Sequence, residues 1–76
     1  MSLTNDIADE LALQTMEILH ATGKDDVIAE LSAALGGFSQ TLEEAYMTAI
    51  RVRRAEERAR MILSKRRKEA GLPSDD

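Results

Sequence analysis

The feature that most constrains this chain is a helical pattern that runs without interruption through its C-terminal half. The pattern begins near Ser39, or at Thr41-Leu42-Glu43-Glu44, which has the sequence of a capping box, and it continues to about Ala70. Gly71 then follows, as is typical of a helix end. A helix of this length, with a rise of about 1.5 Å per residue, is roughly 45 Å long. Few small domains have enough other chain to cover such a rod.

Two shorter helical patterns precede the long one. The first runs from about Thr4 to Thr22 and the second from about Asp26 to Leu35. Gly23 separates these two, and Gly36-Gly37 separates the second from the third. We therefore predict an all-α chain of three helices (long, short and very long), in which the first two pack antiparallel to the third.

The first helix has one broad apolar face and one small apolar patch on the opposite side. The broad face consists of Leu3, Ile7, Leu11, Ile18 and Ala21, flanked by Ala8, Thr15 and Leu19. The opposite patch consists of Leu13, Met16 and His20, which lie among acidic residues. This pattern predicts that the broad face packs against the rest of the protein.

The third helix carries a heptad stripe when Leu42 is placed at an a position. Sustained heptads are typical of coiled coils and helical bundles, and the small alanines in this stripe allow close approach of a second helix. We therefore expect a homo-oligomeric bundle: a homodimer, with a tetramer as the alternative. The predicted interface consists of Leu42, Ala45, Ala49, Val52, Glu56, Ala59 and Leu63.

The size of the chain supports this expectation. A single core in 76 residues rarely contributes more than about 3–5 kcal/mol, so short chains usually add disulfides, a metal or another subunit. Disulfides, thiolate zinc sites and cysteine nucleophiles are excluded because the chain has no cysteine, and it has only one histidine. We expect one helical domain over residues 1–76 with a disordered tail at 71–76. We expect no cofactor, metal, small-molecule ligand or catalytic residue.

Two polar residues have alternative interpretations. Glu56 interrupts the heptad stripe, either as a buried group that sets the register or binds a ligand in an oligomer, or as a surface partner of Arg53 or Arg60; we favour the surface pair. His20 lies near a helix C-terminus, where it complements the helix dipole. Its alternative role is that of a general base with Glu17 as partner.

Charge is strongly segregated along the chain, although the net charge is −4. Residues 1–45 hold nine acids and one base, whereas residues 46–76 hold nine bases and five acids. The basic end has three interpretations. It binds nucleic acid, it contacts an acidic segment of the same or another chain, or it is a solvated end whose charges complement the helix dipole. The patch available to such a partner consists of Arg58, Lys65, Arg66, Arg67 and Lys68.

The N-terminal residues lack the basic and apolar regions of a signal peptide, and no apolar run suits a membrane span. We therefore expect a cytoplasmic protein without a membrane partner, and the composition resembles that of a bacterial protein. Our leading hypothesis is a non-enzymatic, homo-oligomeric protein-interaction or regulatory module. The alternative is a nucleic-acid-binding regulator that uses residues 51–68; it is less favoured because the acidic net charge opposes phosphate binding.

Overall fold

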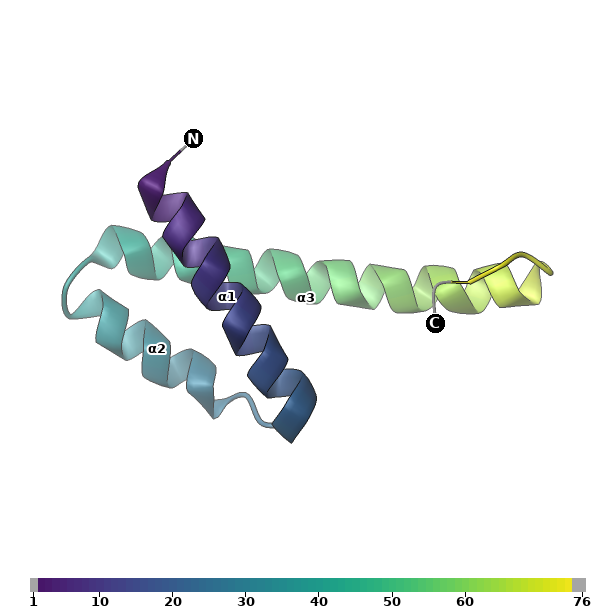
Figure 1. Ribbon diagram of the computed structural model, residues 1–76, viewed down its shortest axis with the longest axis horizontal. Helices are drawn as coiled ribbons and strands as arrows, with labels where there is room; N and C mark the ends of the chain where they lie inside the picture. Colours follow the sequence, from purple (N-terminus) through teal and green to yellow (C-terminus); the bar gives the residue numbers. More distant parts are fainter. Residues whose placement is uncertain (1, 75–76) are drawn as a thin grey trace.

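The computed structural model describes residues 2–74, which form three helices in the predicted order (Figure 1). Helix α1 spans Leu3–Thr22, α2 spans Asp26–Gly36 and α3 spans Gln40–Glu69. The described residues contain no strand. The all-α prediction is therefore confirmed, and each helix ends within about two residues of its predicted position.

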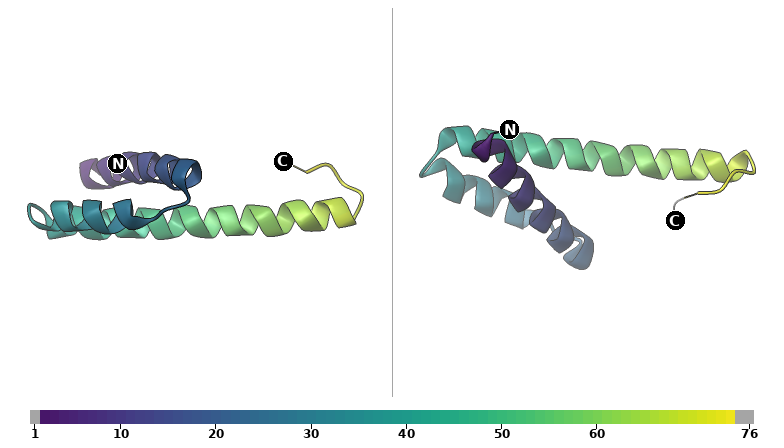
Figure 2. Two further views of the ribbon diagram at one scale, coloured as in Figure 1. Left: turned by 90° about the horizontal axis from the view of Figure 1, so that it is seen from below. Right: turned by 45° about the horizontal axis from the view of Figure 1, so that its top comes forward.

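The helices lie in two layers. Figure 2 shows α2 and α3 side by side in one layer and α1 alone in the other, so that the molecule measures 50 × 30 × 13 Å. Helix α3 packs against both other helices, whereas α1 and α2 touch only briefly. The thin dimension means that none of residues 2–74 covers α3 on the side away from its two neighbours.

The direction of α1 differs from the prediction. Helix α2 runs back along the first part of α3, as expected, but α1 crosses α3 obliquely (Figure 1). Asp9 pairs with Arg53, and His20 further along α1 pairs with Glu57 further along α3. Thr15, which lies between them on α1, is hydrogen-bonded to Tyr46 nearer the start of α3. Helix α1 therefore crosses α3 and does not run back along it, so the predicted antiparallel packing is wrong for α1.

The core lies where the three helices meet. Helix α3 contributes Tyr46, which is 0% exposed, and Ile50, which is 2% exposed. The other buried apolar residues are Ala8, Ala12 and Met16 of α1 and Ile28 of α2. Larger residues that are only partly buried surround them, and these are Leu11, Leu19, Leu31, Leu35, Leu42 and Met47.

The buried face of α1 is rotated from the one that the sequence pattern predicts. Leu3, Ile7 and Ile18 of the predicted face are exposed, whereas Met16 of the opposite patch is buried. The helices cross over Ala8 and Ala12, whose small side chains leave room for a close approach. Leu11 of the broad face and Leu19 on its flank pack against the core and are partly buried.

Of the two predicted starts of α3, the structure confirms the one near Ser39. Ser39 is the N-cap residue, and its Oγ accepts a hydrogen bond from the backbone N–H of Leu42 at 3.1 Å. The capping box predicted at residues 41–44 is therefore wrong, because those residues already lie in the first turns of the helix. Glu43 instead accepts a 2.5 Å hydrogen bond from Ser32 Oγ, which ties α2 to the start of α3.

The chain turns back after α3. Gly71 has φ of +77°, a left-handed conformation that suits glycine, and Leu72 N–H donates to the carbonyl of Arg67 at 2.8 Å. Arg67 Nε donates to the carbonyl of Pro73 at 2.5 Å. Residues 75–76 of the predicted disordered tail lie outside the described residues.

Candidate oligomer interface

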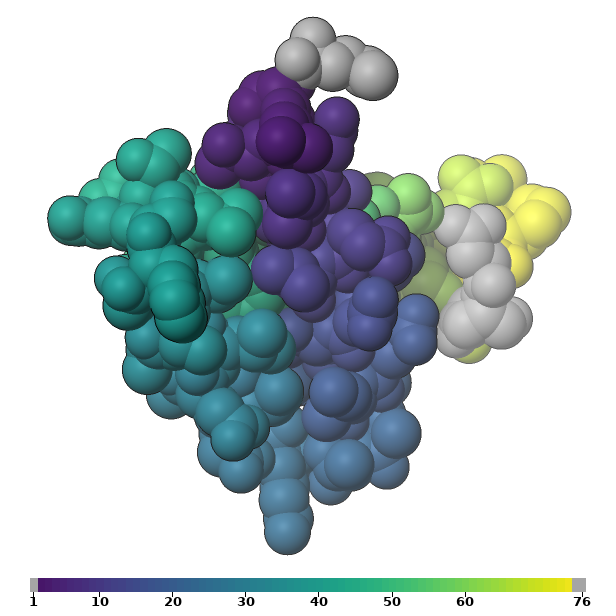
Figure 3. All heavy atoms as spheres, turned by 60° about the vertical axis from the view of Figure 1, so that its left-hand side comes forward, coloured from purple at the N-terminus to yellow at the C-terminus, as the bar shows by residue number. Residues whose placement is uncertain are grey.

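Helix α3 is covered by the other helices over only part of its length. Two ion pairs join α3 to α1 within the described residues, and the one further along α3 is Glu57 with His20. Residues 58–69, which we call the distal segment, continue past the end of α1 (Figures 1 and 3). Every residue of the distal segment is exposed except Ser64, which is half-buried.

The structure divides the predicted interface into two parts. Three of its residues pack against the core beside α1 and are partly buried: Leu42, Ala45 and Ala49. The other four are exposed: Val52, Glu56, Ala59 and Leu63. Because α1 crosses α3 on this side, the seven predicted residues do not form one free surface.

A second heptad phase runs along the side of α3 that faces away from Tyr46 and Ile50. Its positions are separated alternately by four and three residues, so they lie on one face of the helix. We call this set the open stripe, and all its members are exposed: Thr48, Val52, Ala55, Ala59 and Ile62. The heptad phase predicted from Leu42 does not coincide with this stripe, although the spacing of the stripe is also present in the sequence.

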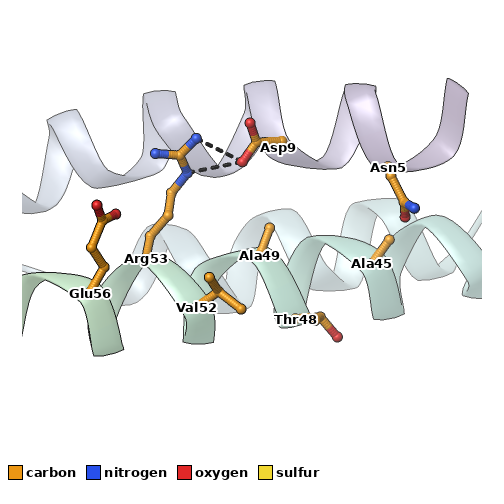
Figure 4. Close-up of a pocket in the computed structure, with 8 residues that line it drawn as sticks. All are labelled: Asn5, Asp9, Ala45, Thr48, Ala49, Val52, Arg53 and Glu56. Carbon is orange, nitrogen blue, oxygen red and sulfur yellow. Dashed lines mark hydrogen bonds and ion pairs between the residues drawn. The ribbon is translucent and has the colours of Figure 1, made fainter. Parts of the chain in front are cut away.

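The groove between α1 and α3 borders the open stripe. Figure 4 shows Arg53 reaching across to Asp9, with Nε and Nη2 at 3.1 and 2.7 Å from one carboxylate oxygen. Thr48 and Val52 point away from α1, whereas Ala45 and Ala49 point toward it. The groove is lined by Asn5, Asp9, Ala45, Thr48, Ala49, Val52, Arg53 and Glu56.

Glu56 takes part in a surface ion pair within its own helix. Its carboxylate lies 3.0 Å from the Arg60 guanidinium, one turn further along, and both side chains are at least half exposed. Arg53 is paired with Asp9 instead. The favoured interpretation of Glu56, a surface partner of a neighbouring arginine, is therefore confirmed for Arg60.

His20 joins the end of α1 to α3. Its Nε2 atom lies 2.5 Å from a carboxylate oxygen of Glu57, and both side chains are largely exposed. The contact is an ion pair when the imidazole is protonated and a hydrogen bond when it is neutral. Glu17, the partner expected from local spacing, is replaced by Glu57 because α1 crosses α3 at this point.

The five bases of the predicted patch are all exposed in the distal segment. Arg66 lies 3.4 Å from Glu69, and Arg67 donates to the carbonyl of Pro73. Arg58 and Lys65 form no ion pair within residues 2–74. The helical repeat distributes these bases around the whole circumference of α3, so they do not form one flat basic surface.

Comparison of the chain with protein-family models, with curated proteins and with solved structures found no match. Within residues 2–74, no helix has the length and apolar character required to cross a membrane. No group of three or more acidic or histidine side chains in the same part of the chain is arranged to hold a metal ion. The uncovered face of α3 is thus the feature on which a functional proposal rests.

Proposed function

We propose that this protein is a non-enzymatic, self-associating helical module in which a second copy covers the exposed face of α3. The observation that carries the proposal is the open stripe, which includes Val52 at 61% exposure and Ile62 at 48%. Leu63 lies beside it and is 60% exposed. Val52 and Ile62 follow heptad spacing on the side of α3 that faces away from the buried Tyr46 and Ile50.

The small size of the core supports a second copy. Among residues 2–74, only six apolar residues are buried, and two of these are alanines. Apolar surface contributes about 25 cal/mol per Å² when it is removed from water. Covering the open stripe with another copy therefore adds burial that the single chain lacks.

Self-association is tested by sedimentation velocity of the full chain from about 1 to 100 μM. A dimer or larger species is expected to increase with concentration. Ile62→Asp places a charge in the open stripe, so it should weaken association by about tenfold or more. Met61→Asp is the matched control, because Met61 is similarly exposed but lies on another side of the helix. A folded monomer at every concentration would refute the proposal.

The alternative function is nucleic-acid binding through the distal segment. It is favoured by the exposure of Arg58 and Lys65, which have no ion pair within the described residues. It is weakened by the distribution of the bases around the helix and by the lack of an aromatic residue between Arg51 and Lys68 on which bases could stack. Titration with mixed DNA and RNA near 50 mM salt tests it, because electrostatic binding is strong at low salt.

A further inference from the structure

We propose that two copies pair their α3 helices in antiparallel orientation, so that Glu44 near the start of each helix lies against Arg58 in the distal segment of the other. This inference rests on the proposed self-association and specifies its geometry. It draws on three observations: the charge distribution along α3, the spacing of the open stripe, and an exposed aromatic residue at the start of α3.

The charge distribution along α3 favours the antiparallel orientation. Residues 40–50 contain two acids and no base, whereas the distal segment contains six bases and one acid. A parallel pair places the two distal segments side by side, and their like charges repel. An antiparallel pair separates the two distal segments and brings the first residues of each one, near Arg58, to the acidic start of the partner helix around Glu44.

The spacing of the open stripe defines a register for this pair. Continued toward the start of α3, the same spacing includes Thr41, which is exposed, and Ala45, which is partly buried at the edge of the stripe beside α1. A two-fold axis beside Ile50 lets each position of the extended stripe meet another position of the same stripe on the second copy. The layers are then Val52 against Thr48, Ala55 against Ala45, and Ala59 against Thr41.

The side chains in these layers suit a close approach of two helices. Alanine and threonine occupy all positions except Val52, so the helix axes can lie near the lower end of the usual range of about 8–10 Å. Larger apolar residues lie at the two ends of the contact. There, the register places Phe38, which is 97% exposed, near Ile62 of the second copy.

The same register forms two identical ion pairs. It places Glu44 beside Arg58 of the second copy, and the two-fold axis repeats the contact. Both side chains are exposed, and neither forms an ion pair within residues 2–74. Within residues 2–74, the only hydrogen bond to the Glu44 carboxylate is a long one of 3.4 Å from Gln40 Nε2.

Arg51 distinguishes the two orientations. In the antiparallel register it lies near Arg51 of the second copy, so the two charges repel. In a parallel coiled coil with the same stripe, it lies beside Glu56 of the second copy, five residues further on, where the charges attract. Arg51→Ala is therefore expected to strengthen an antiparallel dimer and to weaken a parallel one.

The decisive test is a charge exchange with Glu44→Arg and Arg58→Glu, each in the full chain. Each variant alone places like charges at both contacts, so its self-association at 50 mM salt should weaken on the order of tenfold. A mixture of the two variants restores both pairs with reversed sign, so heterodimers should exceed the statistical proportion. Circular dichroism verifies that both variants, which change exposed side chains, remain helical.

The outcomes of this test distinguish an error in the register from an error in the proposed self-association. If wild-type chains associate but the mixture forms only statistical heterodimers, the antiparallel register is wrong and the proposed self-association remains. A dimer that is weakened by Arg51→Ala overturns the antiparallel orientation in the same way. Wild-type chains that stay monomeric, or that assemble only on added RNA or DNA, overturn both proposals.

Discussion

The two halves of α3 belong to one continuous helix but are held in different ways. The proximal half contains Tyr46 and Ile50, which are buried against α1 and α2. The distal segment contains Met61, Ile62 and Leu63, which are between 48% and 64% exposed. The comparison shows that helical structure and tertiary packing are separable here, because the distal segment is helical beyond the last ion pair that joins α3 to α1 in the described residues.

Local interactions account for the helicity of the distal segment. Its residues are mostly strong helix formers, namely arginine, alanine, leucine, methionine and lysine. The pairs Arg60–Glu56 and Arg66–Glu69 each add about 0.2–0.5 kcal/mol, and bases in the last turn complement the helix dipole. An isolated helix of this length is marginal, but this one extends a turn that is already formed.

The largest difference in stability between the two halves is expected when an isoleucine in each half, Ile50 or Ile62, is replaced by alanine. Ile50→Ala creates a cavity in the core and should lower the free energy of unfolding by about 2–5 kcal/mol, enough to unfold much of the protein. Ile62→Ala removes an exposed side chain and should leave the unfolding midpoint of the monomer almost unchanged. Thermal unfolding followed by circular dichroism at about 1 μM measures both. Equal losses of stability would show that the distal segment is packed.

A proline at residue 59 tests whether the two halves unfold independently. Ala59→Pro removes a backbone hydrogen bond and clashes with the preceding turn, at a local cost of about 3 kcal/mol. We expect the helical signal of the distal segment to decrease while the core retains its unfolding midpoint to within a few degrees. Ala59→Gly, which costs only about 1 kcal/mol, is the milder control. Collapse of the whole helical signal would contradict this prediction.

The buried hydrogen bond between Thr15 and Tyr46 should have an intermediate effect. Thr15 Oγ1 donates to the carbonyl of Leu11, so the Tyr46 hydroxyl donates to Thr15 across 2.7 Å. Thr15→Val leaves that hydroxyl buried without an acceptor and should cost about 1–3 kcal/mol. Tyr46→Phe removes the donor itself and should cost about 1 kcal/mol. Urea unfolding compares the two variants, and the reverse order of stabilities would rule out this hydrogen-bond direction.

The smallest expected difference is that between the coupling energies of two arginine–carboxylate pairs. Arg53 joins α3 to Asp9 of α1 and is 27% exposed, whereas Arg60 pairs with Glu56 within α3 and is 64% exposed. A double-mutant cycle should assign about 0.5–1 kcal/mol to Arg53–Asp9 and about 0.3–0.5 kcal/mol to Arg60–Glu56. Both energies should decrease at 1 M salt because exposed charges are screened. Coupling energies in the opposite order would mean that the contact between helices is no stronger than the local one.

Helix positions were predictable because they depend on local signals. Glycines at 23, 36 and 37 interrupt the helical pattern, and the observed ends lie close to them. The rotation of α1 was not predictable from its own periodicity, since α1 has apolar residues on several sides. The crossing over Ala8 and Ala12 and the hydrogen bond of Thr15 with Tyr46 select the buried side, and both depend on a distant segment.

The candidate interface was predictable only in part, for a similar reason. The sequence contains two heptad phases along α3, and both include Val52 and Ala59. Which phase is free depends on the side from which α1 approaches, and this contact involves residues more than 30 positions apart. The partner of His20 was missed on the same grounds, because Glu57 lies on another helix.

Tyr46 is an intrinsic fluorescence probe of the core. It is the only tyrosine, and the chain has no tryptophan, so near-ultraviolet absorption and emission come almost entirely from one ring. That ring is fully buried and its hydroxyl is hydrogen-bonded to Thr15, whereas the distal segment contains no tyrosine. Tyrosine emission therefore follows the core alone, while far-ultraviolet circular dichroism follows all three helices. Recording both on one sample distinguishes fraying of the C-terminal helix from global unfolding without any attached label.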